Sequence, residues 1–250
     1  MFAECQFVDA APPVFRPVSF IIPAHNEQRY ITKTIESISA AIDSLKLIAE
    51  VIVVNDDSTD ETENIGKRLG TRVINVSLRN IGAVRNAGAK VASHPWLIFV
   101  DADTILPVET LRETLTFLAQ GDAGGGARVE LDQEKPIFFV KRIMFYCVVL
   151  AWHIIGRWAA GCYMYCRKDL FDSFGGFDEN YFAAEELFFS RELKRRGRFR
   201  LVRKPVITSA RKLRKYSSWQ LMRFLLTPAL QLRSMLRSRT GLEILYQDKR

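Results

Sequence analysis

Short β-rich runs alternate with longer helical segments over the first hundred residues, and this alternation constrains the fold more than any other feature of the 250-residue chain. Four runs have the β-branched and aromatic residues typical of buried parallel strands: Val18–Ile22, Glu50–Val54, Arg72–Val76 and Trp96–Val100. Strands that alternate with helices predict a parallel sheet covered by helices on both faces. The chain is 48% hydrophobic, and its length suffices for one such α/β unit.

Apolar residues at helical spacing predict the helices between these strands. The segment Tyr30–Leu45 repeats isoleucine and leucine on one helical face. Ser58 and Glu61 have the spacing of a capping box, which predicts a second helix that ends at Gly70. A third helix is predicted over Gly82–Ala92.

The alternation loosens after Asp101. We expect a helix over Val108–Gln120, a glycine-rich strand over residues 124–131 and an apolar helix from about Pro136. The stretch Ile143–Gly156 lacks Lys, Arg, Asp and Glu, but it is shorter than the roughly 20 apolar residues that a spanning helix needs. We therefore expect it to pack against the protein or to lie at an interface.

Three acidic loops follow predicted strands: PAHNE from Pro23 to Glu27, NDDSTDET from Asn55 to Thr62, and DADT from Asp101 to Thr104. In an open α/β sheet a ligand binds beyond the carboxyl ends of the strands, so these loops should share one crevice. One acidic loop alone is more often a helix cap than an active site. Three acidic loops that converge need a cation, because like charges packed together destabilise one another.

Asp101 and Asp103 offer oxygen ligands suited to Mg²⁺ or Mn²⁺. A divalent ion that is also bound by phosphate oxygens neutralises charge on a departing diphosphate. The sequence therefore predicts a divalent cation beside the fourth strand.

Taken together, these segments resemble the family 2 glycosyltransferases of the GT-A fold. The resemblance covers roughly residues 18–200 and rests on an ordered set of motifs: FIIPAHNE, VVNDDSTDET, NIGAVRNAG, FVDAD, GGFDE and EELFFSREL. It implies an α/β fold of the Rossmann-like GT-A type, with three layers (α/β/α) and a mostly parallel central sheet. It also implies an enzyme that transfers a sugar from a nucleotide-diphosphate donor, with UDP expected ahead of GDP.

The resemblance assigns residues to the donor pocket where positions match the family. The nucleotide-sugar-binding residues it implies are Pro23, Ala24, Asn26, Glu27, Asp56, Arg85 and Asp101. Among these, Asp56 matches the acid that binds the base, and Arg85 matches a residue that faces the nucleotide or its phosphates. Asp103 matches the direct metal ligand, with Asp101 as its partner toward ribose or metal.

The second acidic motif of the family is usually Glu-Asp, and its Asp is the general base. Here the pair is Glu185 and Glu186, so we assign Glu186 as the base with Glu185 as the alternative. A second departure is NDDSTD in place of DDGSTD, in which Asn55 replaces an acid and Asp57 replaces glycine.

We predict that the enzyme transfers the sugar to a hydroxyl group of a lipid-linked or saccharide acceptor, with inversion of the anomeric configuration. The two departures motivate an alternative, a degenerate transferase that binds a nucleotide sugar as a scaffolding subunit. An oxidoreductase of the Rossmann type is disfavoured, because no GxGxxG follows the first strand. A sugar nucleotidyltransferase is disfavoured because PAHNE is unlike a glycine-rich phosphate loop.

Charged residues are unevenly distributed along the chain. Residues 191–250 hold 18 Lys or Arg against three Asp or Glu, while residues 1–190 hold 18 against 25. We predict an N-terminal extension over 1–16, a transferase domain over 17–210 with a nucleotide-sugar half (17–104) and an acceptor half (105–210), and a basic amphipathic helical segment over 211–250. The basic segment suits an anionic membrane surface. Its aromatics form no obvious stacking platform, so nucleic acid is not expected.

The opening residues have no basic region followed by an apolar core, which disfavours a secretory signal. The four cysteines lack CxxC spacing, and we expect free thiols. A cytoplasmic location is predicted, with peripheral contact on the cytoplasmic face of a membrane.

Overall fold

The computed structural model describes residues 15–133, 139–151, 157–181 and 185–215. Its strands are β1 (Val18–Ala24), β2 (Ala49–Asp56), β3 (Arg72–Val76), β4 (Trp96–Val100), β5 (Thr104–Ile105), β6 (Gly124–Leu131), β7 (Tyr163–Arg167) and β8 (Phe199–Thr208). Its helices are α1 (Ile31–Leu45), α2 (Thr62–Arg68), α3 (Ile81–Val91), α4 (Val108–Ala119), α5 (Phe139–Ala151), α6 (Lys168–Ser173), α7 (Glu185–Arg196) and α8 (Arg211–Lys215).

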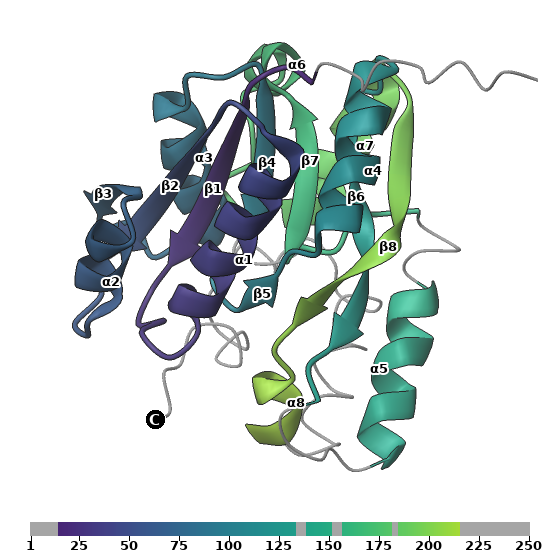
Figure 1. Cartoon of the computed structure of the whole chain (residues 1–250). Coiled ribbons are helices and arrows are strands. Elements are labelled where there is room, and N and C mark those ends of the chain that lie inside the picture. The colour runs from purple at the N-terminus through teal and green to yellow at the C-terminus, as the bar shows by residue number, and fades with distance from the viewer. Residues whose placement is uncertain (1–14, 134–138, 152–156, 182–184, 216–250) are drawn as a thin grey trace, which may run out of the picture.

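The described strands form one eight-stranded sheet in the order β3-β2-β1-β4-β7-β6-β8-β5 (Figure 1). The strands β3, β2, β1 and β4 are parallel, as the sequence predicted. Beyond β4 the sheet is mixed: β7 is antiparallel to both β4 and β6, whereas β6 and β8 are parallel. The predicted α/β class with a mostly parallel sheet is confirmed.

The helices predicted between the first four strands are present, but one predicted cap is wrong. Helix α2 begins at Thr62, and its N-cap Glu61 makes no side-chain capping bond. The hydroxyl of Ser58 instead accepts a hydrogen bond from the backbone N–H of Asn26 at 3.0 Å. A contact with a distant loop has replaced the local capping bond that the spacing suggested.

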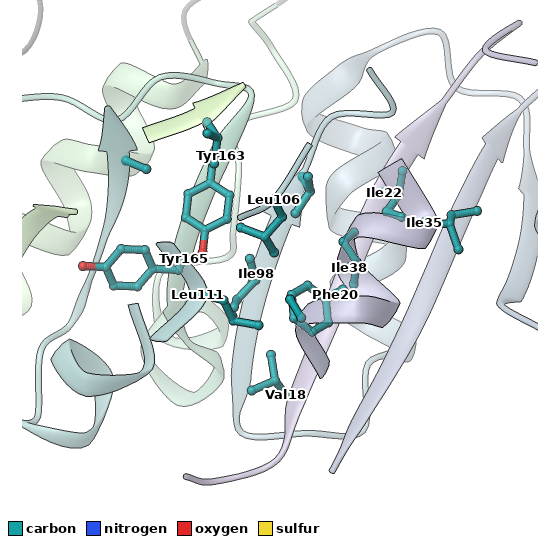
Figure 2. Close-up of a cluster of buried hydrophobic side chains, with 14 of the residues drawn as sticks. Val18, Phe20, Ile22, Ile35, Ile38, Ile98, Leu106, Leu111, Tyr163 and Tyr165 are labelled. Atoms are coloured by element: carbon teal, nitrogen blue, oxygen red, sulfur yellow. The ribbon is translucent and has the colours of Figure 1, made fainter. Parts of the chain in front are cut away.

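Alternate residues of each strand pack against opposite helical layers. On one face, Phe20 and Ile98 pack with residues of α1 and α4, and Figure 2 shows this cluster around Ile38 and Leu111. On the other face, Ile21, Phe99 and Met164 pack with residues of α3, α6 and α7. The result is the three-layer arrangement that the sequence predicted, with the sheet in the middle.

Gly88 brings α3 close to the sheet. A Cβ atom at this position would lie 2.5 Å from Cγ2 of Ile21 and 2.8 Å from Cγ2 of Val54. Any larger residue would therefore push α3 away from β1 and β2. This packing matters for function because α3 carries Arg85.

The predicted domain boundaries remain a prediction. Strands from the nucleotide-sugar half and from the acceptor half belong to the same sheet. Residues 1–14 and 216–250, which hold most of the two predicted terminal segments, lie outside the described residues. Met144 and Phe145 of α5 pack against a small cluster formed by Leu131, Ala210 and Leu213, and Leu213 lies on α8.

Within the part of the chain that the structure describes, none of the helices combines the length and the apolar character required to traverse a bilayer. Cys147, Cys162 and Cys166 are free thiols, as expected, and Cys5 lies outside the described residues.

Ile38 and Ile48 provide a matched test of the core. Ile38 is fully buried in the α1 layer, whereas Ile48 is 71% exposed. We expect Ile38→Ala to lower the free energy of unfolding by about 2–5 kcal/mol, because it leaves a cavity. Ile48→Ala should change it by less than about 0.5 kcal/mol. Urea denaturation measures both, and equal effects would contradict the assigned burial.

Candidate active site

The three acidic loops emerge at one edge of the sheet. Strand β1 pairs in parallel with β2 on one side and with β4 on the other. Their carboxyl ends therefore point the same way, and the loops after Ala24, Asp56 and Val100 meet there. Pro23 and Ala24 are the last two residues of β1, and both are buried.

Backbone and side-chain bonds lock the first two loops together. The side-chain oxygen of Asn26 accepts from the backbone N–H of Thr59 at 2.9 Å. The backbone N–H of Glu27 donates to the hydroxyl of Thr62 at 2.8 Å. Asn26 itself has a left-handed backbone with φ of 54°, a conformation that asparagine tolerates better than most residues. The predicted donor residues of the first loop are therefore held in a fixed position.

Asp56 organises the loop that follows β3. Its carboxylate accepts hydrogen bonds from the backbone N–H of Leu78 at 2.7 Å and of Arg79 at 3.0 Å. The guanidinium of Arg79 in turn contacts a ring nitrogen of His25 at 2.7 Å and a carboxylate oxygen of Asp57 at 3.1 Å. Sequence reasoning missed His25 and Arg79, because only the fold brings them to Asp56.

Asp57 stands where the resembled family has glycine, and its φ of 56° explains why the exchange is tolerated. The left-handed backbone region is open to glycine and, at small cost, to aspartate and asparagine. The departure therefore preserves the shape of the loop and adds a partner for Arg79.

The DADT turn is held on both sides. The hydroxyl of Thr34 on α1 donates to the carbonyl of Ala102 at 2.8 Å. The backbone N–H of Asp101 donates to the carbonyl of Cys162 at 3.1 Å. The side chain of Asp101 is 34% exposed and that of Asp103 is 12% exposed. The turn is thus rigid at its backbone while both carboxylates lie at the edge of the site.

Arg85 is a buried guanidinium that connects three elements. Its Nη1 donates to Glu185 at 2.6 Å, and its Nη2 donates to Asp101 at 2.9 Å and to the carbonyl of Gly161 at 2.8 Å. Burial lowers the pKa of Arg85, but Asp101 and Glu185 outweigh burial and raise it above the usual range. The guanidinium therefore stays charged. Both terminal nitrogens of Arg85 thus have partners within the protein, and its contact with the nucleotide stays a prediction.

Glu186 lies next to this network. A Cβ atom on Gly161 would be 3.7 Å from Nη2 of Arg85 and 3.9 Å from Oε2 of Glu186, so the two side chains border the same point. Burial and, after it, the charge of Glu185 raise the pKa of Glu186 to about 8. The sequence left two candidates for the base. In the structure Glu185 is paired with Arg85, whereas Glu186 is the one with the raised pKa, and the assignment of Glu186 as the base stays a prediction.

Asn80 and Asn86 explain why the NIGAVRNAG and GGFDE segments occur together. The amide of Asn80 donates to the carbonyls of Glu179 at 3.0 Å and Tyr181 at 3.1 Å, while its oxygen caps α3. The side chain of Asn86 both accepts from and donates to the backbone of Phe177 at 2.9 Å. Helix α3 thereby holds the loop that leads toward Glu185 and Glu186.

Arg211 is a second guanidinium at the site, and sequence reasoning missed it. It contacts both carboxylate oxygens of Glu27, at 2.6 and 2.5 Å, and Oδ2 of Asp103 at 3.0 Å. In the sequence it stood only at the start of the basic segment. Its position depends on the pairing of β5 with β8, which the sequence did not indicate.

The acidic side chains of this site supply only part of the ligand set that a divalent ion needs. Among residues 15–133, 139–151, 157–181 and 185–215, no three His, Cys, Asp or Glu side chains gather as a metal cluster. Glu27 and Asp103 do converge on one cationic group, the guanidinium of Arg211. Hard oxygen ligands at a position that attracts positive charge fit Mg²⁺ or Mn²⁺, provided that a diphosphate supplies the remaining ligands.

The chain is thus an α/β protein whose acidic loops gather at the carboxyl edge of its sheet. Residues 19–173 match the family model described as glycosyl transferase family 2. This match covers more than half of the chain, and the chain therefore belongs to that family.

Curated relatives match over shorter stretches. Poly(ribitol-phosphate) beta-N-acetylglucosaminyltransferase TarS of Staphylococcus aureus is 33% identical over 107 residues, which are 40% of this chain and 18% of TarS. The 4,4'-diaponeurosporenoate glycosyltransferase of Staphylococcus haemolyticus is 35% identical over 105 residues, which are 39% of this chain and 27% of that protein. Each match therefore spans only a minor part of its relative.

Solved structures share the fold over most of the chain. The fragment 1–349 of S. aureus TarS in complex with UDP-GlcNAc superposes with a TM-score of 0.61 at 21% identity, covering 92% of this chain and 71% of the fragment. The mannosyltransferase PcManGT from Pyrobaculum calidifontis in complex with GDP-Man and Mn²⁺ gives a TM-score of 0.65 at 20% identity, covering 86% and 63%. The GT-A fold that the sequence predicted is confirmed.

Arg85 offers a stability test of the buried network. We expect Arg85→Ala to lower the free energy of unfolding by about 3–5 kcal/mol, because Glu185 is left buried beside an absent partner. The control is Arg68→Ala, since Arg68 is 66% exposed and lies 3.7 Å from an exposed Glu61. That exposed pair should contribute no more than about 1 kcal/mol. Urea denaturation compares them, and a small effect of Arg85→Ala would refute the network.

Proposed function

We propose that this chain is an inverting glycosyltransferase that moves a sugar from a nucleotide-diphosphate donor to an acceptor hydroxyl. The observation that carries the proposal is the raised pKa of Glu186 beside the Arg85 network, in a member of family 2. A carboxylate with a pKa near the working pH is suited to general base catalysis. This property favours an active enzyme over the degenerate scaffolding subunit.

The donor site is proposed at the carboxyl edge of β1, β2 and β4. Pro23, Ala24 and Asp56, at the ends of β1 and β2, and Asn26 and Glu27, in the loop after β1, are proposed to line this site. UDP is expected ahead of GDP, and the solved structures that share the fold support both, since one was obtained with UDP-GlcNAc and another with GDP-Man. Arg79 and His25 join this site through their contacts with Asp56 and with each other.

Asp103, with Asp101 as its partner, is proposed to hold Mn²⁺ or Mg²⁺. The Mn²⁺ in the PcManGT complex supports this assignment. When bound, such an ion supplies Lewis acidity that neutralises charge on the departing diphosphate.

The proposed chemistry is one displacement. Glu186 accepts the proton of the acceptor hydroxyl while that oxygen forms a bond to the anomeric carbon. The bond between this carbon and the diphosphate oxygen breaks, and the nucleoside diphosphate leaves with the electron pair. A single displacement inverts the anomeric configuration, and it needs no nucleophilic carboxylate on the enzyme. Arg85 keeps Glu185 and Asp101 in place around this step.

The acceptor is proposed to be lipid-linked or a saccharide, at the cytoplasmic face of a membrane. Helix α5 supports the lipid side of this proposal, because Phe139, Ile143 and Leu150 are 75%, 47% and 58% exposed on it. Exposed apolar side chains at helical spacing suit an interfacial helix. The basic segment proposed to assist lies mostly outside the described residues.

Nucleotide binding is the first test. We expect UDP or GDP with Mn²⁺ to raise the melting temperature, because a ligand at about 100 times its Kd stabilises the native state by about 2.7 kcal/mol. Asp103→Asn should remove the Mn²⁺-dependent part of the shift. Asp172→Asn is the control, since Asp172 lies on α6 and is 57% exposed. A panel of nucleoside diphosphates that gives no shift would sink the proposal.

Glu186→Gln is the second test. It should lower kcat by at least about 100-fold, the range expected for loss of a general base. Donor affinity should stay unchanged, because the amide keeps the size of the side chain. In the wild type, kcat should rise with pH up to about 8 and then level, since the base form of Glu186 must be deprotonated.

The control for this substitution is Glu192→Gln, on the same helix. Glu192 pairs with Arg195 and Arg196 at the surface. Its variant should keep the wild-type rate and pH profile. Retained transfer by Glu186→Gln would exclude Glu186 as the base. Donor binding without any transfer by the wild type, across acceptors of both classes, would favour the scaffolding alternative.

A further inference from the structure

Arg211 bridges two carboxylates of the proposed donor site. Its Nη1 and Nη2 contact Glu27 at 2.6 and 2.5 Å, and its Nε contacts Asp103 at 3.0 Å. All three nitrogens of one guanidinium therefore face the residues that would meet the diphosphate and its metal. The side chain also lies over the ring of Tyr30 at 4.8 Å and is 31% exposed.

The backbone places Arg211 here without help from these side-chain contacts. Thr104 pairs with Thr208 in the sheet, and the backbone N–H of Ser209 donates to the carbonyl of Asp103 at 3.1 Å. Helix α8 is fixed separately, because Arg214 pairs with Asp132 at 2.7 Å. The guanidinium of Arg211 can therefore change partners while its backbone remains beside the DADT turn.

A divalent ion and the guanidinium would compete for the carboxylate of Asp103. Its Oδ2 accepts from Nε of Arg211 at 3.0 Å, and this carboxylate is the proposed ligand of the ion. The donor diphosphate brings negative charge to the same place. Guanidinium groups bind phosphate oxygens through two parallel hydrogen bonds, and their charge persists at any physiological pH. A side chain released from Asp103 would thus find a new anionic partner close by.

We propose that Arg211 exchanges partners during donor binding: it pairs with Glu27 and Asp103 in the donor-free protein, and it binds the diphosphate once a divalent ion occupies Asp103. This inference rests on the proposed function. It explains why a basic residue outside the acidic motifs contacts two of them. It also assigns Arg211, the first residue of α8, a role distinct from the membrane contact proposed for the basic segment.

The test compares Arg211→Met with the wild type by titration calorimetry. For Mn²⁺ alone, the variant should bind at least about 3-fold more tightly, because the competing guanidinium is absent. For UDP or GDP at saturating Mn²⁺, it should bind about 10-fold to 100-fold more weakly, the loss expected for one charge-assisted hydrogen-bonding group. A purely structural role would not tighten Mn²⁺ binding.

Arg68→Met is the control, since Arg68 is 66% exposed on α2 and pairs with the exposed Glu61 at 3.7 Å. It should leave both affinities unchanged. Arg211→Lys retains the charge without the forked geometry, and it should fall between wild type and Arg211→Met for the nucleotide. This variant keeps the test valid if the methionine variant does not fold.

The outcomes separate this inference from the proposed function. If the wild type binds no nucleoside diphosphate, the proposed function fails and the inference fails with it. If the wild type binds and the Arg211 variants bind Mn²⁺ and nucleotide equally well, only the exchange of partners is overturned. Opposite shifts in the two affinities support it.

Discussion

The site depends on the buried guanidinium of Arg85. It reaches the tip of β4 through Asp101, the loop before β7 through Gly161, and the start of α7 through Glu185. These elements lie far apart in the sequence, and one charged group fixes their spacing. A buried guanidinium is tolerated only while its carboxylate partners are present, because an unpaired buried charge strongly destabilises the folded state. The same contacts that hold the fold together therefore also set the geometry around Glu186.

Charge balance accounts for much of the surrounding structure. Asp56 is satisfied by backbone N–H groups, Asp57 by Arg79, and Glu27 with Asp103 by Arg211. The acids that follow the strands are thus distributed among separate partners. A site arranged in this way remains stable without a bound ion.

The sequence predicted those parts of the fold that depend on local periodicity. The first four strands and the helices α1, α3 and α4 follow from apolar spacing, and the motifs located their loops at one edge. The antiparallel strand β7 was not predicted, because its place between β4 and β6 is set by pairing between distant segments. The capping bond predicted at Ser58 is absent for the same reason, since the backbone N–H of Asn26, in a distant loop, donates to its hydroxyl.

The sequence located the motifs of the candidate site, whereas long-range contacts determined how the side chains of these motifs are arranged. His25, Arg79 and Arg211 carry no local signal, since each owes its position to a residue at least 20 positions away. Arg85 was predicted to face the nucleotide, an assignment that stays a prediction, while its observed partners are Glu185, Asp101 and Gly161. Positive φ at Asp57 is likewise visible only in the folded chain.

The adjacent glutamates Glu185 and Glu186 differ in their contacts with Arg85. Arg85 is shared by Glu185 and Asp101, so one positive charge faces two negative ones. Glu186 adds a third carboxylate beside them, and Arg85 lowers its pKa by less than burial and Glu185 raise it. The raised pKa of Glu186 therefore follows first from its burial and second from the charge of Glu185. Substituting glutamate for the usual aspartate lengthens the side chain but leaves this charge balance intact.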